Sequence, residues 1–174
     1  IEDECNKDKF KYFNKQKFYL YISIYYIIEG KFNLANNYLN LITMNNDSVL
    51  LNLEYKILLI INYIENHKLD LADSTTESLR KYISRLKLNK IIFMRKELII
   101  KILIKLSLMS YNFQKVKINQ QRNILELERL SNPYRFYDYE MIIFHEWFES
   151  KVKGIPYDHT EVMNRLKKLN KARN

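Results

Sequence analysis

Apolar residues recur along the first part of this chain at the three- and four-residue spacing of amphipathic α-helices. The first such stretch covers residues 8–29, and a break near Asn14 would divide it into two helices. Gly30 is expected to end it, because Gly readily adopts the left-handed backbone conformation that closes helices. Asn33 then stands as the N-cap of a helix that runs to about Thr43, before a polar loop at residues 45–48.

The same spacing predicts two further pairs of helices. Residues 50–66 and 71–86 form the second pair, with Asp70 as the cap of its second helix. Residues 90–111 and 113–130 form the third pair. The three pairs together predict a chain of antiparallel helical hairpins.

The helix expected at residues 90–111 differs from the others in its charge pattern. Glu97, Lys101 and Lys105 lie four residues apart and form one narrow polar stripe, with apolar residues all round. Such a helix is mostly buried, as it would be in the middle of an array. Its partner helix is expected to end at Asn132 and Pro133, since Pro cannot continue a helix.

A seventh helix is expected at residues 136–152, followed by the breaker Gly154-Ile155-Pro156. A last amphipathic helix runs from Glu161 to about Lys171, with Thr160 as its cap. The charged residues 167–173 suit the polar outer face that the end of a helical array presents to water. We therefore expect these two helices to close the array.

A stretch that occurs twice indicates how the hairpins assemble. Residues 26–36 recur as residues 63–73 at an offset of 37, with five of eleven positions identical. A repeat period between 20 and 50 residues is typical of stacked helical hairpins, each too small to bury its apolar face alone. We expect one domain over residues 1–174, the C-terminal part of a longer array. Its hairpins are expected at about 18–44, 50–86 and 90–131, and its capping helices within 136–172.

Composition supports an all-α fold and excludes several alternatives. The chain holds two Gly and two Pro, far below average usage, so it has little material for the turns of a β fold. Cys5 is the single cysteine and cannot form an internal disulfide. The most hydrophobic run, residues 98–109, is shorter than the roughly 20 residues of a membrane span. No signal peptide is visible, so a cytoplasmic location is expected.

The first two hairpins resemble the tetratricopeptide repeat, a family with an aromatic residue in its first helix and an Ala early in its second. Tyr26, Gly30 and Ala35 stand at family-like spacing, with Ser23 where the family places a small residue. In the second copy Tyr63 and Ala72 match, whereas His67 replaces the Gly and Ile60 the small residue. The period of 37 exceeds the 34 of the family, and the third hairpin lacks the Ala, so the chain resembles a diverged member.

The second half is similar to the C-terminal region of uncharacterised bacterial tetratricopeptide-like proteins. The likeness rests on residues 78–83, the Asn132-Pro133 pair and residues 144–152. The family resemblance implies a right-handed superhelix of about seven or eight helices. It also implies a concave groove, lined by the first helix of each hairpin, that holds a peptide or a partner protein.

The segment from His145 to Glu149 is the one candidate for a metal site. Residues i and i+4 share a helix face, but a zinc protease helix would carry a second His at the fifth position. The simpler interpretation, a partly exposed polar face opposite Phe144, Trp147 and Phe148, is preferred. No nucleophile elbow and no glycine-rich phosphate loop occurs, so we predict no enzyme activity, no metal and no cofactor.

A basic segment offers a second kind of function. Residues 80–125 hold twelve Lys or Arg and one acid, a net charge of +11 against +9 for the whole chain. Gathered on one face, these cations would bind phosphates with an affinity that falls steeply with salt. Alternatively, an AT-rich genome would raise Lys everywhere, and the cations would form a solvated face or contact an acidic peptide. The candidate nucleic-acid contacts are Arg80, Lys81, Arg85, Lys87, Lys90, Arg95, Lys96, Lys115, Lys117 and Arg122.

The first expected function is that of a non-catalytic scaffold that binds another protein or a peptide in a helical groove. An acidic partner is one form of this expectation. A nucleic-acid-binding array is the alternative. The aromatic first helix also offers a face for self-association, because exposed apolar patches promote it. Of the adjacent Tyr25 and Tyr26 only one can face the core, and Tyr25 is assigned to the groove. The candidate groove residues are Tyr21, Tyr25, Asn62, Arg95, Lys101 and Lys105.

Overall fold

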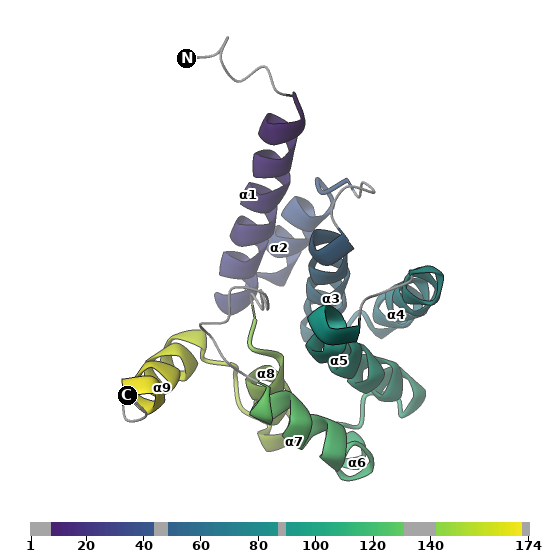
Figure 1. Cartoon of the computed structure of the whole chain (residues 1–174), viewed down its shortest axis with the longest axis vertical. Helices are drawn as coiled ribbons and strands as arrows, with labels where there is room; N and C mark the ends of the chain where they lie inside the picture. Colours follow the sequence, from purple (N-terminus) through teal and green to yellow (C-terminus); the bar gives the residue numbers. More distant parts are fainter. Residues whose placement is uncertain (1–7, 44–48, 87–89, 131–141, 172–174) are drawn as a thin grey trace. The chain divides into compact units, whose positions relative to one another are not determined.

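The computed structural model describes residues 8–43, 49–86, 90–130 and 142–171. These residues form helices and no strand, which confirms the all-α prediction (Figure 1). The chain divides into two compact units, Ile1–Ala72 and Asp73–Asn174. The helices are α1 (Asp8–Ile28), α2 (Phe32–Leu39), α3 (Val49–Glu65), α4 (Leu69–Arg85), α5 (Lys90–Leu108), α6 (Phe113–Asn119), α7 (Gln121–Arg129), α8 (Phe144–Lys153) and α9 (His159–Lys171).

The ends of α1 and α3 have the same hydrogen-bonded turn. After α1, the Gly30 N–H donates to the Ile27 carbonyl (3.1 Å) and the Lys31 N–H donates to the Tyr26 carbonyl (2.8 Å). After α3, the His67 and Lys68 N–H groups donate to Ile64 and Tyr63 at the same two distances. This pair of bonds is the Schellman motif, whose capping residue adopts a left-handed conformation. The prediction that Gly30 ends the first helix is confirmed.

A third turn of this kind joins α5 to α6. The Ser110 N–H donates to Ser107 (3.1 Å), the Tyr111 N–H donates to Leu106 (2.8 Å), and both capping residues have positive φ. The hydroxyls of Ser107 and Tyr111 each donate to Asp73 of α4 at 2.6 Å, which ties the end of α5 to α4 within the second unit. The third hairpin therefore keeps the turn although its sequence has diverged.

The positions of buried residues recur at the same 37-residue spacing as the sequence repeat. Every buried residue between positions 15 and 43 has a buried counterpart 37 residues later. The small residue at the start of the second helix shows why: Ala35 and Ala72 are both fully buried, and Val116 takes this place in the third hairpin. Small side chains at this point let the two helices of a hairpin approach closely. The buried pairs are Gln16/Leu53, Leu20/Ile57, Ser23/Ile60, Ile24/Ile61, Ile27/Ile64, Ala35/Ala72, Leu39/Thr76 and Ile42/Leu79.

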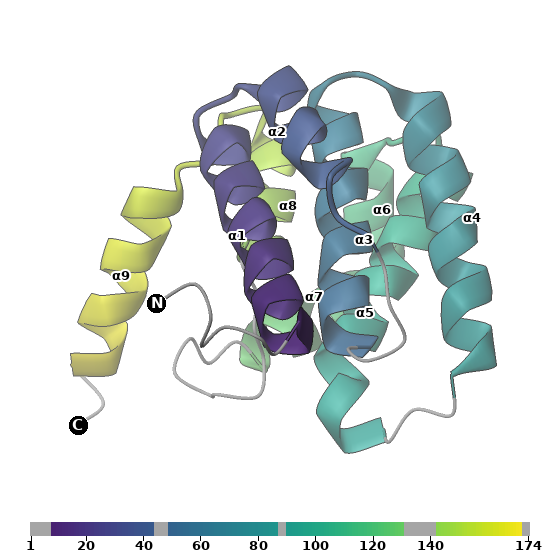
Figure 2. The same ribbon diagram turned by 90° about the horizontal axis from the view of Figure 1, so that it is seen from above.

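In the first unit α2 packs against both α1 and α3, and Figures 1 and 2 show it beside each of them. The side chain of Gln16 fixes the far end of this hairpin, because its carbonyl accepts the Thr43 N–H at 3.0 Å. α1 buries one face, whereas α3 is buried on nearly every side. α1 is therefore an edge helix with a second face in contact with solvent.

The second unit has an aromatic core on α8. Trp147, Phe144 and Phe148 are almost completely buried, and the Phe113 ring at the start of α6 packs edge-on against Trp147 with 5.8 Å between centroids. α5 supplies the aliphatic part of the core, with Glu97 and Lys101 on its exposed stripe as predicted. None of the described helices combines the length and the apolar character needed to cross a membrane.

Three predicted N-caps are wrong, each by two residues. α2 begins at Phe32 and α4 at Leu69, so Asn33 and Asp70 lie inside the first turn of their helices. α9 begins at His159, and the Asp158 carboxylate caps it by accepting the Glu161 N–H at 2.8 Å, where Thr160 had been predicted. In the two repeated hairpins the Schellman turn leads into the next helix directly, so the helix starts before the polar residue.

The helix boundaries also differ in the remaining elements. α1 runs without a break at Asn14. The helix predicted over residues 113–130 divides at Gln120, which is the C-cap of α6 and the N-cap of α7. α8 starts at Phe144, with Ile143 as an extended N-cap, whereas a start at residue 136 was predicted. The polar loop at 45–48, the Asn132-Pro133 stop and residue 136 itself lie outside the described residues.

Candidate functional site

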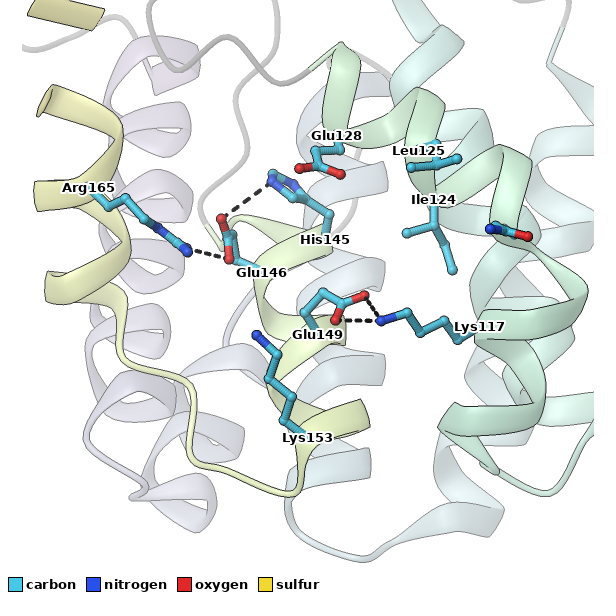
Figure 3. Close-up of a pocket in the computed structure, with 10 residues that line it drawn as sticks. Lys117, Ile124, Leu125, Glu128, His145, Glu146, Glu149, Lys153 and Arg165 are labelled. Atoms are coloured by element: carbon cyan, nitrogen blue, oxygen red, sulfur yellow. Dashed lines mark hydrogen bonds and ion pairs between the residues drawn. The ribbon is translucent and has the colours of Figure 1, made fainter. Parts of the chain in front are cut away.

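A pocket of about 360 Å³ lies in the second unit, between one face of α7 and one face of α8. Helical spacing produces both walls: residues 121, 124, 125 and 128 follow one another along α7, and residues 145, 146, 149 and 153 along α8. Lys117 of α6 and Arg165 of α9 complete the lining (Figure 3). This volume lies within the range of ligand pockets in proteins. We call this pocket the α7–α8 groove.

His145 is held at the groove by a buried arginine. Arg95 of α5 and His145 are 4% and 6% exposed, and Arg95 Nη2 lies 3.3 Å from His145 Nδ1. The same guanidinium donates a hydrogen bond to the Leu127 carbonyl of α7. Because a guanidinium can only donate, Nδ1 must accept and the proton of the neutral ring lies on Nε2. His145 therefore presents an N–H donor on the side away from Arg95.

Two ion pairs fix the carboxylates of α8. Lys117 Nζ lies 2.8 Å from Glu149 Oε1 and 2.9 Å from Oε2, so it bridges α6 to α8. Arg165 Nη2 lies 2.6 Å from Glu146 Oε2, so it bridges α9 to α8. The other oxygen of Glu146 lies 3.7 Å from His145 Nε2 (Figure 3). The Lys117–Glu149 and Arg165–Glu146 pairs each join two helices and thereby hold one wall of the groove in place.

One acid and one base of the lining make no ion pair with the described residues. Glu128 lies beside His145 toward one end of the groove, and Lys153 lies toward the other, with the Glu149–Lys117 pair between them (Figure 3). Ile124 and the exposed Leu125 give the α7 wall an apolar middle. The groove thus offers opposite charges at its two ends and an apolar wall between them.

The lining of the α7–α8 groove consists of acidic, basic, amide, imidazole and aliphatic side chains. The described residues that line the groove include no Ser, Thr, Cys or Tyr that could act as a nucleophile. Nor do the described residues contain a group of three or more His, Cys, Asp or Glu side chains placed to hold a metal ion. His145 was expected on a partly exposed face, but its contact with Arg95 places it in the core. Cys5, the single cysteine of the chain, lies outside the described residues.

The predicted groove residues do not come together at the α7–α8 groove. Tyr21 and Tyr25 are exposed on α1 in the first unit, and Tyr25 is the outward member of the Tyr25–Tyr26 pair as expected. Asn62 is fully buried, and neither of its amide atoms has a hydrogen-bond partner among the described residues. Its assignment as a contact for a partner is therefore wrong. Arg95 is buried too, and its contact with the groove is indirect, through the side chain of His145.

The remaining two predicted residues lie on the polar stripe of α5. Lys101 is exposed and pairs with Glu97 at 2.8 Å, and Lys105 is half-buried one turn later. Neither lines the α7–α8 groove. The signal that could have indicated the groove is the helical spacing of residues 121, 124, 125 and 128.

The basic segment is interrupted by burial and by ion pairs. Arg95 and Lys96 are buried, so the prediction that they present charge to a nucleic acid is wrong. Arg80 and Lys81 both pair with Glu77, and the hydrogen bond from Arg80 lowers the pKa of Glu77 to about 2. Lys87 and the side chain of Lys90 lie outside the described residues. Within the basic segment, the exposed cations without an ion pair to the described residues are Arg85, Lys115 and Arg122.

Comparison of the chain with models of protein families, with curated proteins and with solved structures gives no match.

Proposed function

We propose that this chain is a non-catalytic scaffold that binds a segment of another protein in the α7–α8 groove. The observation that carries the proposal is the groove itself, with an apolar wall between an acid and a base that make no ion pair to the described residues. The wider assignment, a diverged tetratricopeptide-like array with its hairpins stacked in a right-handed superhelix, is part of the same proposal. The repeated turns and the repeated burial of the first two hairpins support it.

The partner segment should carry charges complementary to Glu128 and Lys153. His145 and Lys153 are eight residues apart on α8, which corresponds to about 12 Å at 1.5 Å per residue. Glu128 lies beside His145, so a basic and an acidic side chain roughly this far apart would meet the two unpaired groups. An apolar side chain between them would contact Leu125. The partner is thus mixed in charge, whereas a purely acidic peptide had been considered from the sequence.

The test is affinity capture from native lysate, with the full chain as bait, repeated after nuclease treatment and at high salt. The groove variants are Leu125→Gln and the double charge reversal Glu128→Lys/Lys153→Glu. The matched control is Ile118→Gln, an exposed apolar residue of α6 outside the groove lining. Gln is a good helix former, so the helices should persist.

We expect a protein that is captured by the wild-type chain and by Ile118→Gln, and at least tenfold less by both groove variants. Equal capture by all variants would refute the groove as the binding site. Capture that disappears with nuclease and with Lys115→Glu/Arg122→Glu would instead establish the nucleic-acid alternative. The cytoplasmic location expected from the sequence stays a prediction.

A further inference from the structure

The face of α1 opposite its buried side exposes three large aromatic side chains. Phe18, Tyr21 and Tyr25 are 58%, 47% and 55% exposed. Their spacing of three and four residues places them on one side of the helix. Exposed aromatic residues that adjoin one another, unlike scattered ones, mark an interaction surface. We call this surface the α1 outer face, and its members are Lys15, Phe18, Tyr21, Ile22, Tyr25 and Glu29.

The repeat shows that the fold normally covers this face. The counterparts of Tyr21 and Tyr25 in the second hairpin are Leu58 and Asn62, which are 1% and 0% exposed. The same helix position is therefore interior in one hairpin and surface in the other. Because the burial of apolar surface is favourable, an exposed aromatic face favours association.

The opposite charges at the two ends of the α1 outer face favour a second copy of α1 as the binding partner. Lys15 lies seven residues before Ile22 and Glu29 lies seven residues after it, with the aromatic side chains between them. A second copy of α1, laid antiparallel across a two-fold axis near Ile22, would place each Lys15 against the Glu29 of the other copy. The same register matches position 18 with position 26, so the Phe18 ring would lie one residue away from Tyr25 of the other copy. A parallel arrangement would instead oppose Lys to Lys and Glu to Glu.

We propose that the α1 outer face is a self-association surface, on which a second copy of this chain docks antiparallel through its own α1. The interface is isologous, so each contact occurs twice. It joins aromatic rings, which pack favourably in offset or edge-on arrangements. The contacts that Lys15 and Glu29 make within one chain are weak, so they compete little with ion pairs across the interface. Lys15 Nζ lies 5.7 Å from the centroid of the Tyr19 ring, and Glu29 pairs with Lys31 at 3.6 Å on the exposed surface.

Charge reversal tests the register. Lys15→Glu would oppose Glu to Glu at both ends of the interface, and Glu29→Lys would oppose Lys to Lys, so each variant should be monomeric. Mixed in equal amounts, the two variants regain opposite charges at both ends and should form a heterodimer. The double variant Lys15→Glu/Glu29→Lys should regain the homodimer. Lys115 is an exposed lysine of the second unit with no ion pair to the described residues, so Lys115→Glu controls for the change in net charge.

The measurement is sedimentation velocity of the full chain over a hundredfold range of concentration, with circular dichroism as a check of folding. We expect dimers of the wild-type chain and of Lys115→Glu, and at least tenfold weaker dimerisation of Tyr25→Gln. A wild-type chain that stays monomeric, or single reversals that still dimerise, would overturn the proposal. A mixture that remains monomeric would do the same. Capture of a partner at the α7–α8 groove uses other residues, so the two proposals can fail independently.

Discussion

His67 and Gly30 occupy the same left-handed backbone position, with φ of 55° and 69°, at the ends of α3 and α1. Both lie in a Schellman turn with the same pair of hydrogen bonds. A residue with a Cβ is strained at such a φ, whereas Gly is not. The second hairpin thus keeps the turn at an energetic cost that the first avoids.

This difference predicts opposite effects of two exchanges. His67→Gly should raise the free energy of unfolding by roughly 1 kcal/mol, because relief of the strain exceeds the entropy that Gly adds to the unfolded chain. Gly30→His should lower it by a similar amount. The cause is φ alone, since a Cβ at Gly30 would meet no atom within 4 Å. Urea denaturation of both variants is the measurement, and a destabilised His67→Gly would contradict the prediction.

The buried amide of Asn62 leads to a second prediction. Its side chain is fully buried in α3, and neither amide atom has a hydrogen-bond partner among the described residues. A buried polar group without a partner costs about 1–3 kcal/mol. Asn62→Leu, which is similar in volume, should therefore increase the free energy of unfolding by about 1–3 kcal/mol.

The matched control for Asn62 is Asn66→Leu. Asn66 is one turn further along the chain, and its amide donates to the Asn33 side chain at 3.0 Å on the exposed surface. This exchange should change stability by less than about 0.5 kcal/mol or reduce it slightly. Thermal denaturation of both variants compares them directly. If Asn62→Leu is the less stable variant, the Asn62 amide makes a contact that stabilises the fold.

The Arg95–His145 pair supports a third prediction. Arg95→Met would leave the Leu127 carbonyl and His145 Nδ1 without this buried donor, so we expect a loss of about 1–3 kcal/mol for each of the two acceptors. Arg122→Met, at an exposed position of α7, should change stability by less than about 0.5 kcal/mol. Equilibrium denaturation of both variants tests this. A small effect of Arg95→Met would show that the pair contributes little to the second unit.

Local features of the sequence were predictable because they depend on neighbouring residues. Gly30, Ala35 and the 37-residue match fix turns and burial through contacts within a few residues of the chain. The α7–α8 groove depends on contacts between distant residues: Arg95 and His145 are fifty positions apart, and Lys117 and Glu149 thirty-two. One sequence contains no signal for such pairings. A count of charged residues does not distinguish a buried arginine from an exposed one. The number of exposed cations in the basic segment was therefore overestimated.

The last prediction concerns pH and the junction of α8 and α9. The Ile143 N–H donates to Tyr157 Oη at 3.2 Å, and that hydroxyl lies 3.0 Å from His159 Nδ1. The hydroxyl can donate its own proton only to an unprotonated Nδ1, so this link requires neutral His159. Burial lowers the pKa of His159 below its ordinary value of 6.5, and nearby Asp158 opposes this in part. A positive charge on the first residue of α9 would also be unfavourable at a helix N-terminus.

A group whose folded-state pKa is lowered in this way stabilises the fold only while it is neutral. The contribution of His159 is therefore complete above its unfolded pKa of 6.5, and it is lost as the pH falls from there through the folded pKa. We expect the free energy of unfolding, measured with urea at about pH 8 and about pH 5, to drop less in His159→Gln than in the wild type. Gln keeps an acceptor for Tyr157 and does not titrate, so it isolates this group from the carboxylates. Equal drops in the two proteins would show that the junction is insensitive to protonation of His159.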